Sequence, residues 1–499
     1  MSHRLVYSVP LLLLFLFMRL HNVLSFPVFI DEHEHIRWAR EVYDWHFFAG
    51  ASAGRLFGLW WMSLSGLQDD SALFLARVST GLFNLIGAAV LFDLGRRLLD
   101  KRTGALAVVL YAIAPYAIFH ERLALTDTYV TVWGLLATWF ALRYTHRLSL
   151  VDAVLWGGAL VLAFAAKTTG ITLAIIPLLV VVLMAPRLTW PQRIRGLAVG
   201  YGVFVVGAVA LLVFLRWRGY QYLNAATNIV GTKDTSNVFE RLVDAVPAMW
   251  EIDTLYLALP LLLLAGFLAL YLVWARYRVA LVLIGAALIP LAGVLVFALK
   301  YSARYFHFHM PFVLLLVAVG LGQITRDIAP RSRAASLAVL VLPVLLWGVL
   351  FALPFQQTYF DDPAALALTD LDRLEYVTSD AAGVALPDVA VYLKAQANDG
   401  PIVVVGLLAN CGGLDYYLPD TQPVQLICPT LRWDGTHQPE VVALIDRLAA
   451  EDDTRLWIVL ERSVYIDLEG VTFPVEQQHT FQRPDNLTLI EILRVTHDS

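Results

Sequence analysis

The sequence contains few charged residues. Only 15% of its 499 residues are charged and 59% are hydrophobic, whereas soluble domains are usually about 25% charged. This composition excludes an ordinary soluble protein. The formal net charge is -5, and no basic stretch could form the concentrated positive surface that nucleic-acid binding requires. We therefore expect no nucleic-acid partner.

Cysteine is also scarce, with Cys411 and Cys428 both in the polar C-terminal part. Two cysteines cannot provide a zinc site of the usual spacing. They could form one disulfide if this part lies outside the cell, but two unpaired thiols fit equally well, because sequence separation does not fix the geometry. The glycines at 406, 412 and 413 lack the G-x-G-x-x-G spacing, so no nucleotide cofactor is expected.

Long apolar runs fill most of the first 354 residues. Runs of about 18 or more apolar residues are typical of membrane-spanning helices. Separating the runs at charged breaks predicts about eleven spans. These are 5–25, 72–93, 104–119, 128–144, 151–166, 169–185, 196–216, 254–275, 279–299, 305–323 and 334–354.

The distribution of basic residues predicts the orientation. With the N-terminus in the cytoplasm, most Arg and Lys residues of the connections, such as Arg96, Arg143, Arg193 and Arg331, lie on the inner side, as the positive-inside rule requires. An odd number of spans then places everything after residue 354 outside the cytoplasm. We expect a multi-pass protein of the plasma or inner membrane.

The sequence predicts two domains, a transmembrane domain over 1–354 and an extracytoplasmic one over 355–499. The first includes outer loops at 26–71, which begins with an expected interfacial helix, and at 217–253. The second alternates candidate helices and strands at 387–397, 402–405, 439–449, 456–460 and 487–495. Such alternation is typical of a small α/β domain.

Paired carboxylates follow the first apolar run at Asp31 and Glu32. Acids at the end of a span are costly unless they are used or solvated. Asp31 is our candidate for a general base that takes a proton from an attacking hydroxyl, and Glu32 is a second candidate. The alternative is that both acids cap the following helix.

Asp127 begins the fourth expected span on the same outer side, where it could orient an acceptor or bind a metal. An N-cap role is an equally good interpretation. Lys167, Arg304 and Tyr305 also lie at outer ends of spans, and Arg122 lies in the turn before Asp127. Fixed cations there could hold a phosphate and stabilise the charge that develops on it as it leaves. Anchoring at the headgroup level is the alternative.

Four histidines are weak candidates for binding a divalent metal. They form two His-x-His pairs, His33 with His35 and His307 with His309. Neither pair has the i, i+4 spacing of a well-known zinc motif, so metal use stays open.

At these residues the chain resembles the GT-C superfamily of polyprenyl-phosphate-dependent glycosyltransferases, which includes protein mannosyltransferases and the aminoarabinose lipid A transferase. The resemblance rests on Arg19-Leu20 near the end of the first span and the acids at 31–32, on 76–78 continuing through 94–98, on 122–127, and on Arg304-Tyr305 followed by Pro311.

This resemblance implies an inverting transfer of a sugar from a polyprenyl phosphate, with Asp31 as the base and outer-face basic groups on the lipid phosphate. The acceptor would be a glycolipid, a cell-envelope glycan or a protein. A secondary transporter is the main alternative, but transporters usually place ionisable groups near the midplane and contain repeated halves. A noncatalytic scaffold would leave the clustered acids and cations without a purpose.

Overall fold

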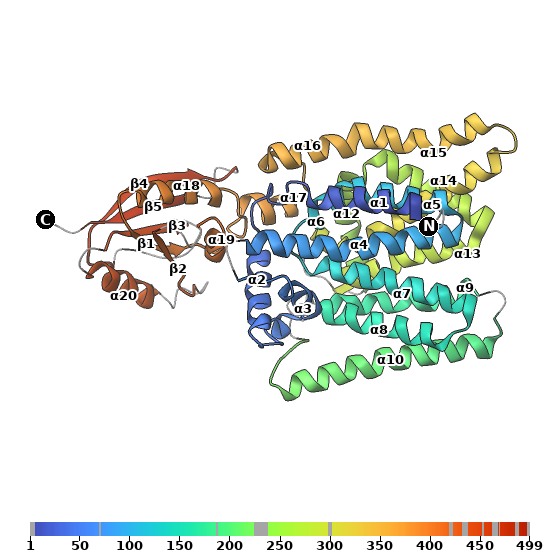
Figure 1. Cartoon of the computed structure of the whole chain (residues 1–499), viewed down its shortest axis with the longest axis horizontal. Helices are drawn as coiled ribbons and strands as arrows, with labels where there is room; N and C mark the ends of the chain where they lie inside the picture. Colours follow the sequence, from blue (N-terminus) through green and yellow to red (C-terminus); the bar gives the residue numbers. More distant parts are fainter. Residues whose placement is uncertain are drawn as a thin grey trace. The chain divides into compact units, whose positions relative to one another are not determined.

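The computed structural model describes residues 5–68, 71–185, 188–223, 238–297, 302–418, 423–431, 438–451, 454–461, 468, 470–484 and 489–496. The chain is mostly helical, with one sheet in its C-terminal part (Figure 1). By internal contacts it divides into two units. The first comprises 1–23, 38–66 and 74–361, and the second comprises 24–37, 67–73 and 362–499.

The first unit is built from apolar helices. Its helices are α1 (Leu5–Leu20), α3 (Phe57–Ser63), α4 (Ala72–Leu98), α5 (Lys101–Ile113), α6 (Pro115–His120), α7 (Asp127–Arg147), α8 (Leu150–Ala166), α9 (Ile175–Leu183), α10 (Trp190–Trp217), α12 (Val238–Leu257), α13 (Leu259–Phe297), α14 (His309–Ile328), α15 (Arg333–Trp347) and α16 (Leu353–Asp361). Short 3₁₀ turns η1 (Ala51–Ala53), η2 (Thr168–Ala174) and η3 (Ala303–Phe306) connect some of them.

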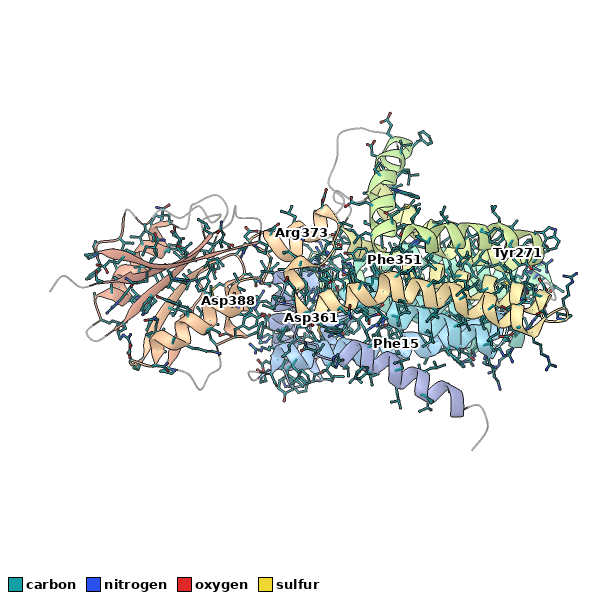
Figure 2. All side chains as sticks on the ribbon, turned by 90° about the horizontal axis from the view of Figure 1, so that it is seen from above. Phe15, Tyr271, Phe351, Asp361, Arg373 and Asp388 are labelled. Atoms are coloured by element: carbon teal, nitrogen blue, oxygen red, sulfur yellow. A yellow bond between two sulfur atoms is a disulfide. The ribbon has the colours of Figure 1, made fainter. Side chains whose placement is uncertain are left out.

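Within the described residues, five helical stretches are long and apolar enough to cross a membrane: 72–98, 190–217, 259–296, 309–328 and 333–361. Few side chains of the second and the fifth stretch are buried despite their apolar character, as expected for surfaces that contact lipid. Figure 2 draws these side chains and labels Phe351 of the fifth stretch. The multi-pass helical prediction is confirmed, while the count of about eleven spans stays a prediction.

Several helix ends follow local rules. Asp100 caps α5 by accepting the Thr103 amide at 3.0 Å, and Pro115 opens α6, because proline needs no amide partner at a first helical position. The expected break between spans 254–275 and 279–299 is a kink at Arg276 inside α13.

Part of the predicted second outer loop is helical. Residues 238–253 form most of α12, and 224–237 lie outside the described residues. The polar residues of this stretch alternate with Phe239, Val243, Val246 and Trp250, which recur every three or four residues. This spacing is typical of a helix, but the polar and charged residues between these positions make the stretch resemble a loop.

The second unit contains an α/β domain, which confirms the predicted small C-terminal sheet. Its described strands are β1 (Ile402–Leu407), β2 (Val424–Ile427), β3 (Leu456–Glu461), β4 (Val475–Gln482) and β5 (Leu489–Val495). They form a sheet of order β2-β1-β3-β5-β4, in which β1 is parallel to β2 and β3 while β5 is antiparallel to β3 and β4.

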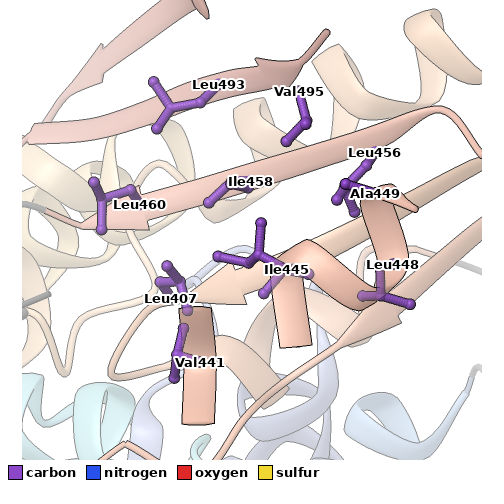
Figure 3. Packing of buried hydrophobic residues seen from close by; sticks show 11 residues of the cluster. Leu407, Val441, Ile445, Leu448, Ala449, Leu456, Ile458, Leu460, Leu493 and Val495 are labelled. Carbon is purple, nitrogen blue, oxygen red and sulfur yellow. The ribbon is translucent and has the colours of Figure 1, made fainter. Parts of the chain in front are cut away.

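Helices cover both faces of this sheet. On one face α20 (Gln438–Ala449) packs Val441, Ile445 and Leu448 against alternate residues of β1, β3 and β5 (Figure 3). Trp457 points to the opposite face, where its ring lies 6.2 Å from that of Tyr392 in α18 (Leu386–Ala397). Burial on two faces explains why β1 and β3 read as continuous apolar runs.

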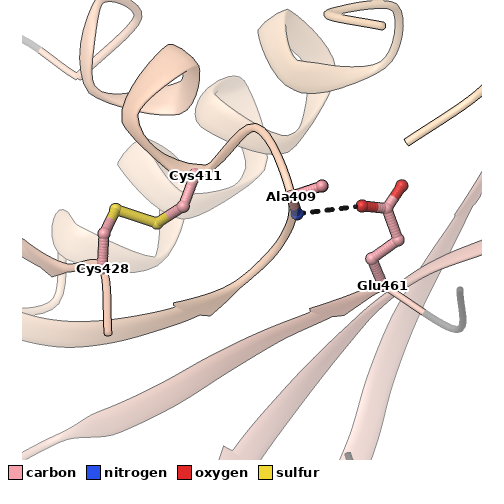
Figure 4. Close-up of a disulfide and its surroundings, with 4 residues drawn as sticks. All are labelled: Ala409, Cys411, Cys428 and Glu461. Atoms are coloured by element: carbon pink, nitrogen blue, oxygen red, sulfur yellow. Dashed lines mark hydrogen bonds between the residues drawn. A yellow bond between two sulfur atoms is a disulfide. The ribbon is translucent and has the colours of Figure 1, made fainter. Parts of the chain in front are cut away.

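The two cysteines are joined. Cys411, in α19 (Cys411–Asp415), forms a disulfide with Cys428 after β2, with Cα atoms 5.8 Å apart (Figure 4). Nearby, burial raises the pKa of Glu461 to about 7 although Arg483 lies 2.6 Å from its carboxylate. The disulfide resolves the alternative that the sequence left open.

We predict that neither cysteine of the native protein reacts with a maleimide in denaturant until a reductant is added. Replacing both cysteines by alanine should lower the stability of the C-terminal domain by about 3 kcal/mol, because the disulfide closes a loop of moderate length. Mass spectrometry and denaturant unfolding measure these effects. Labelling without reductant would contradict the disulfide.

Candidate active site

The first unit contains a buried carboxylate with several partners, Glu121, which directly follows α6. Arg19 at the end of α1 donates to it from Nε at 3.0 Å and lies 2.9 Å away from Nη2. Nε2 of His307 lies 2.9 Å from the other carboxylate oxygen. Asn84 of α4 and Tyr111 of α5 also donate to Glu121.

This network connects α1, α4, α5 and the turn after α6 to the start of α14. Arg19 and Glu121 are fully buried, and Arg19 also donates to the carbonyl oxygens of Tyr111 and Ala112 at 2.9 Å each. A buried ion pair is tolerated only when its remaining donors and acceptors are also bonded. In this protein these hydrogen bonds fix the turn after α6, which leads to Asp127, and the residues before α14, which include Arg304 and Tyr305.

Asp127 and Lys167 form a second buried ion pair. Nζ of Lys167, at the C-cap of α8, lies 2.7 Å from Oδ1 of Asp127, the first residue of α7. The Lys167 ammonium also lies 4.8 Å from the ring centre of Tyr305 in η3, and the Arg304 guanidinium packs 5.6 Å from the same ring. The structure therefore brings together four predicted site residues from three different connections.

Arg122 is placed differently from this cluster. It is fully buried, and it donates to the carbonyl oxygens of Met18 and Asn22 at 2.8 Å each and to that of His21. Its guanidinium also packs 5.0 Å from the ring centre of Tyr359. Because these contacts satisfy the carboxyl end of α1, they favour an anchoring role over the predicted phosphate contact.

The histidine candidates occupy separate surroundings. His307 belongs to the Glu121 network, and His309 lies 3.6 Å from Asp253 of α12. In the second unit His33 packs against Tyr416, with ring centres 6.0 Å apart, and His35 is buried. In the part of the chain that the structure describes, no three His, Cys, Asp or Glu side chains gather as a metal site would require.

The predicted acids of the second unit lie in the first turn of α2 (Ile30–Tyr43). Glu32 is buried and accepts the Phe29 amide at 3.1 Å, which is the backward half of a capping box. This bond agrees with the capping alternative for Glu32, while its catalytic role stays a prediction. Asp31, beside it, is half-buried.

The sequence interpretation did not assign a role to Arg19 or Glu121. Both stand in apolar surroundings, one near the end of an expected span and one in a tight turn. An ionisable residue inside a membrane segment generally has a partner, so opposite charges at these two positions were a usable signal. What the sequence does not give is the pairing across 102 residues.

Residues 56–217 match the dolichyl-phosphate-mannose-protein mannosyltransferase family. The chain is similar to ArnT from Cupriavidus metallidurans bound to undecaprenyl phosphate, with 15% identity, a TM-score of 0.61 and 98% of each chain covered. No curated protein matches the sequence.

A second similar structure is the oligosaccharyltransferase AglB from Archaeoglobus fulgidus, in complex with an inhibitory peptide and a dolichol-phosphate. Here the identity is 11% and the TM-score 0.52, over 98% of this chain and 74% of that one. At these identities the structures show the fold. The family match covers less than half of the chain, and together with the shared fold it supports the resemblance to GT-C glycosyltransferases found in the sequence.

We predict that Glu121→Gln destabilises the protein by about 3–5 kcal/mol, because it leaves the Arg19 charge buried without its counter-ion. Thermal or denaturant unfolding in detergent micelles measures this change. Adding Arg19→Met should recover part of the loss. The matched control is Glu34→Gln, which breaks a partly exposed pair with Arg37 and should cost about 1 kcal/mol or less. Equal stability of the two single variants would contradict the role of Glu121.

Proposed function

We propose that the protein transfers a sugar from a polyprenyl-phosphate donor to an acceptor at the extracytoplasmic face of the plasma or inner membrane. The acceptor is a glycolipid, a cell-envelope glycan or a protein. Two solved structures of this fold, ArnT and AglB, hold undecaprenyl phosphate and dolichol-phosphate, and this supports the donor class. The alternative function, a secondary transporter, has no such support from similar structures, and it gives no role to Lys167 and Arg304.

The observation that carries this proposal is the cluster of Lys167, Arg304 and Tyr305 around Asp127. Basic residues are disfavoured on the outer side of a membrane protein, so two of them close to one tyrosine ring need a reason. A lipid phosphate supplies one, because Arg and Lys both bind phosphate oxygens strongly. Asp127 fixes the ammonium group of Lys167 and offsets part of the local positive charge.

The reaction proceeds by one displacement. The acceptor oxygen attacks the anomeric carbon, the bond from that carbon to the phosphate oxygen breaks, and the lipid phosphate leaves with the electron pair. Asp31 accepts the proton of the acceptor hydroxyl. Lys167 and Arg304 stabilise the negative charge that grows on the leaving phosphate, which lowers the barrier more than it strengthens substrate binding.

Asp31→Asn should reduce transfer from a polyprenyl-phosphate sugar by about 10²–10⁴-fold, because the amide keeps the shape of the carboxylate but cannot take the proton. Thermal unfolding should be unchanged. The measurement is single-turnover transfer by purified protein to membrane acceptors. Asp44→Asn is the control, since it changes an exposed aspartate that follows the same helix. Wild-type turnover by Asp31→Asn would reject Asp31 as the base.

Arg304→Ala should weaken donor binding and slow transfer together, because the guanidinium contacts the phosphate both before and during its departure. Binding of the unsubstituted polyprenyl phosphate, measured by displacement of a labelled lipid, should weaken by about tenfold or more. Arg218→Ala, at the exposed end of α10, should leave both values unchanged. If Arg304→Ala binds and reacts as the wild type does, Arg304 is an anchor only.

A further inference from the structure

The strand order of the C-terminal sheet reverses at one point, and α/β domains usually bind their ligands at such a point. In open sheets the ligand lies outside the carboxyl ends of the strands where the strand order reverses, which for the order 2-1-3 lies between β1 and β3. In this protein the positions that follow these strands are Ala409 and Asn410 after β1 and Glu461 at the end of β3. Oε2 of Glu461 accepts the Ala409 amide at 3.3 Å (Figure 4).

These positions contact a segment of the same chain. Nδ2 of Asn410 donates to the carbonyl oxygens of Val28 at 3.1 Å and of Ala381 at 3.2 Å. The Val28 amide donates to the Tyr417 hydroxyl at 2.9 Å, and the Ile30 amide donates to the carbonyl oxygen of Ala381 at 3.1 Å. The backbone that enters α2 is thus bonded on both sides of Phe29.

The packing at this place leaves no room for extra atoms. A Cβ atom at Gly383 would lie 2.0 Å from the carbonyl oxygen of Val28, and one at Gly412 would lie 1.9 Å from the His33 ring. The ring of Phe29 lies 4.4 Å from that of Tyr376. Residues 28–33 therefore pack against the residues that follow β1, one of the two strands beside whose carboxyl ends other α/β domains hold a ligand.

The residues that bind this segment are themselves held firmly. Asn410 is buried and precedes Cys411, whose disulfide ties it to the end of β2. The Glu461 carboxylate lies 2.6 Å from Arg483, and Arg483 donates to the carbonyl oxygen of Ser379, two residues before Ala381. Asn410 and the stretch that carries Ala381 are therefore each linked to the sheet.

We propose that the C-terminal domain positions Asp31 through Asn410, which fixes the chain three residues before that carboxylate. This inference rests on the proposed role of Asp31 as the base. A base must lie within hydrogen-bond reach of the proton that it takes, and displacements of about 1 Å can cost about 10²-fold in rate. The domain thus uses the ligand-binding edge of its fold to hold a residue of its own chain.

The test is Asn410→Asp in the full-length protein. Aspartate keeps the shape but, when ionised, has no donor and faces two carbonyl oxygens. Amide hydrogen exchange at Val28 and Ile30 should accelerate by about tenfold or more. The kcat for transfer should fall by about tenfold while the donor KM changes less than twofold, because positioning acts in the transition state.

Tyr417→Phe provides a milder second variant, because it removes the hydroxyl that accepts the Val28 amide. It should accelerate exchange at Val28 and lower kcat in the same direction. Asn410→Ser, which keeps one donor, should lie between Asn410→Asp and the wild type. Asn398→Asp, at the exposed end of α18, is the matched control and should change neither quantity. A thermal unfolding transition like that of the wild type shows that each variant is folded.

The possible outcomes separate this inference from the proposed function. Faster exchange in Asn410→Asp with unchanged kcat, while Asp31→Asn is inactive, would overturn the positioning role and leave Asp31 as the base. Unchanged amide exchange in Asn410→Asp would show that Asn410 does not hold the backbone of residues 28–30. An active Asp31→Asn would instead reject Asp31 as the base, the part of the proposed function on which this inference rests, whatever the exchange data show.

Discussion

A carboxylate buried among apolar helices must have all its hydrogen-bonding positions filled, and Glu121 imposes this constraint on the first unit. Its partners come from α1, α4, α5 and the residues before α14. Each partner must therefore be brought to one point, which fixes the ends of these helices relative to one another. Apolar packing alone is poorly directional and would not define these positions as closely.

The positions of Lys167 and Arg304 depend on the Glu121 network. His307 binds Glu121 and lies three residues after Arg304, while Arg122, the residue after Glu121, holds the carboxyl end of α1. The turn that begins at Glu121 ends at Asp127, which holds Lys167. One buried charge thus supports the positions of the cations that we assign to the donor phosphate. A preorganised arrangement of this kind costs no reorganisation during the reaction.

Much of the fold could be predicted from the sequence because apolar runs and period-two patterns report burial directly. The strand at 402–405 and the helix at 439–449 were predicted within a few residues of β1 and α20. The strands β2 and β4 were missed because they lie at the two edges of the sheet and carry mixed polar residues. The helix α12 was missed because its apolar residues are diluted by charged ones.

The site was less predictable. Candidate residues such as Asp127 and Lys167 could be found from charges at span ends, but their pairing across 40 residues could not. Composition also does not distinguish a charge that caps a helix from one that meets a substrate, so the contacts of Glu32 and Arg122 with helix ends could not be predicted. The hydrogen bond from Asn410 to Val28 joins positions 382 residues apart, and no local sequence pattern encodes such a contact.

The most direct measurement of the central claim is an experimental structure of the protein in lipid nanodiscs with a bound polyprenyl phosphate. The account predicts that phosphate oxygens lie within hydrogen-bond distance of Lys167 Nζ or the Arg304 guanidinium, close to Tyr305. A phosphate bound elsewhere, for example beside the basic residues at the end of α4 and the start of α5, with Lys167 and Arg304 untouched, would contradict it.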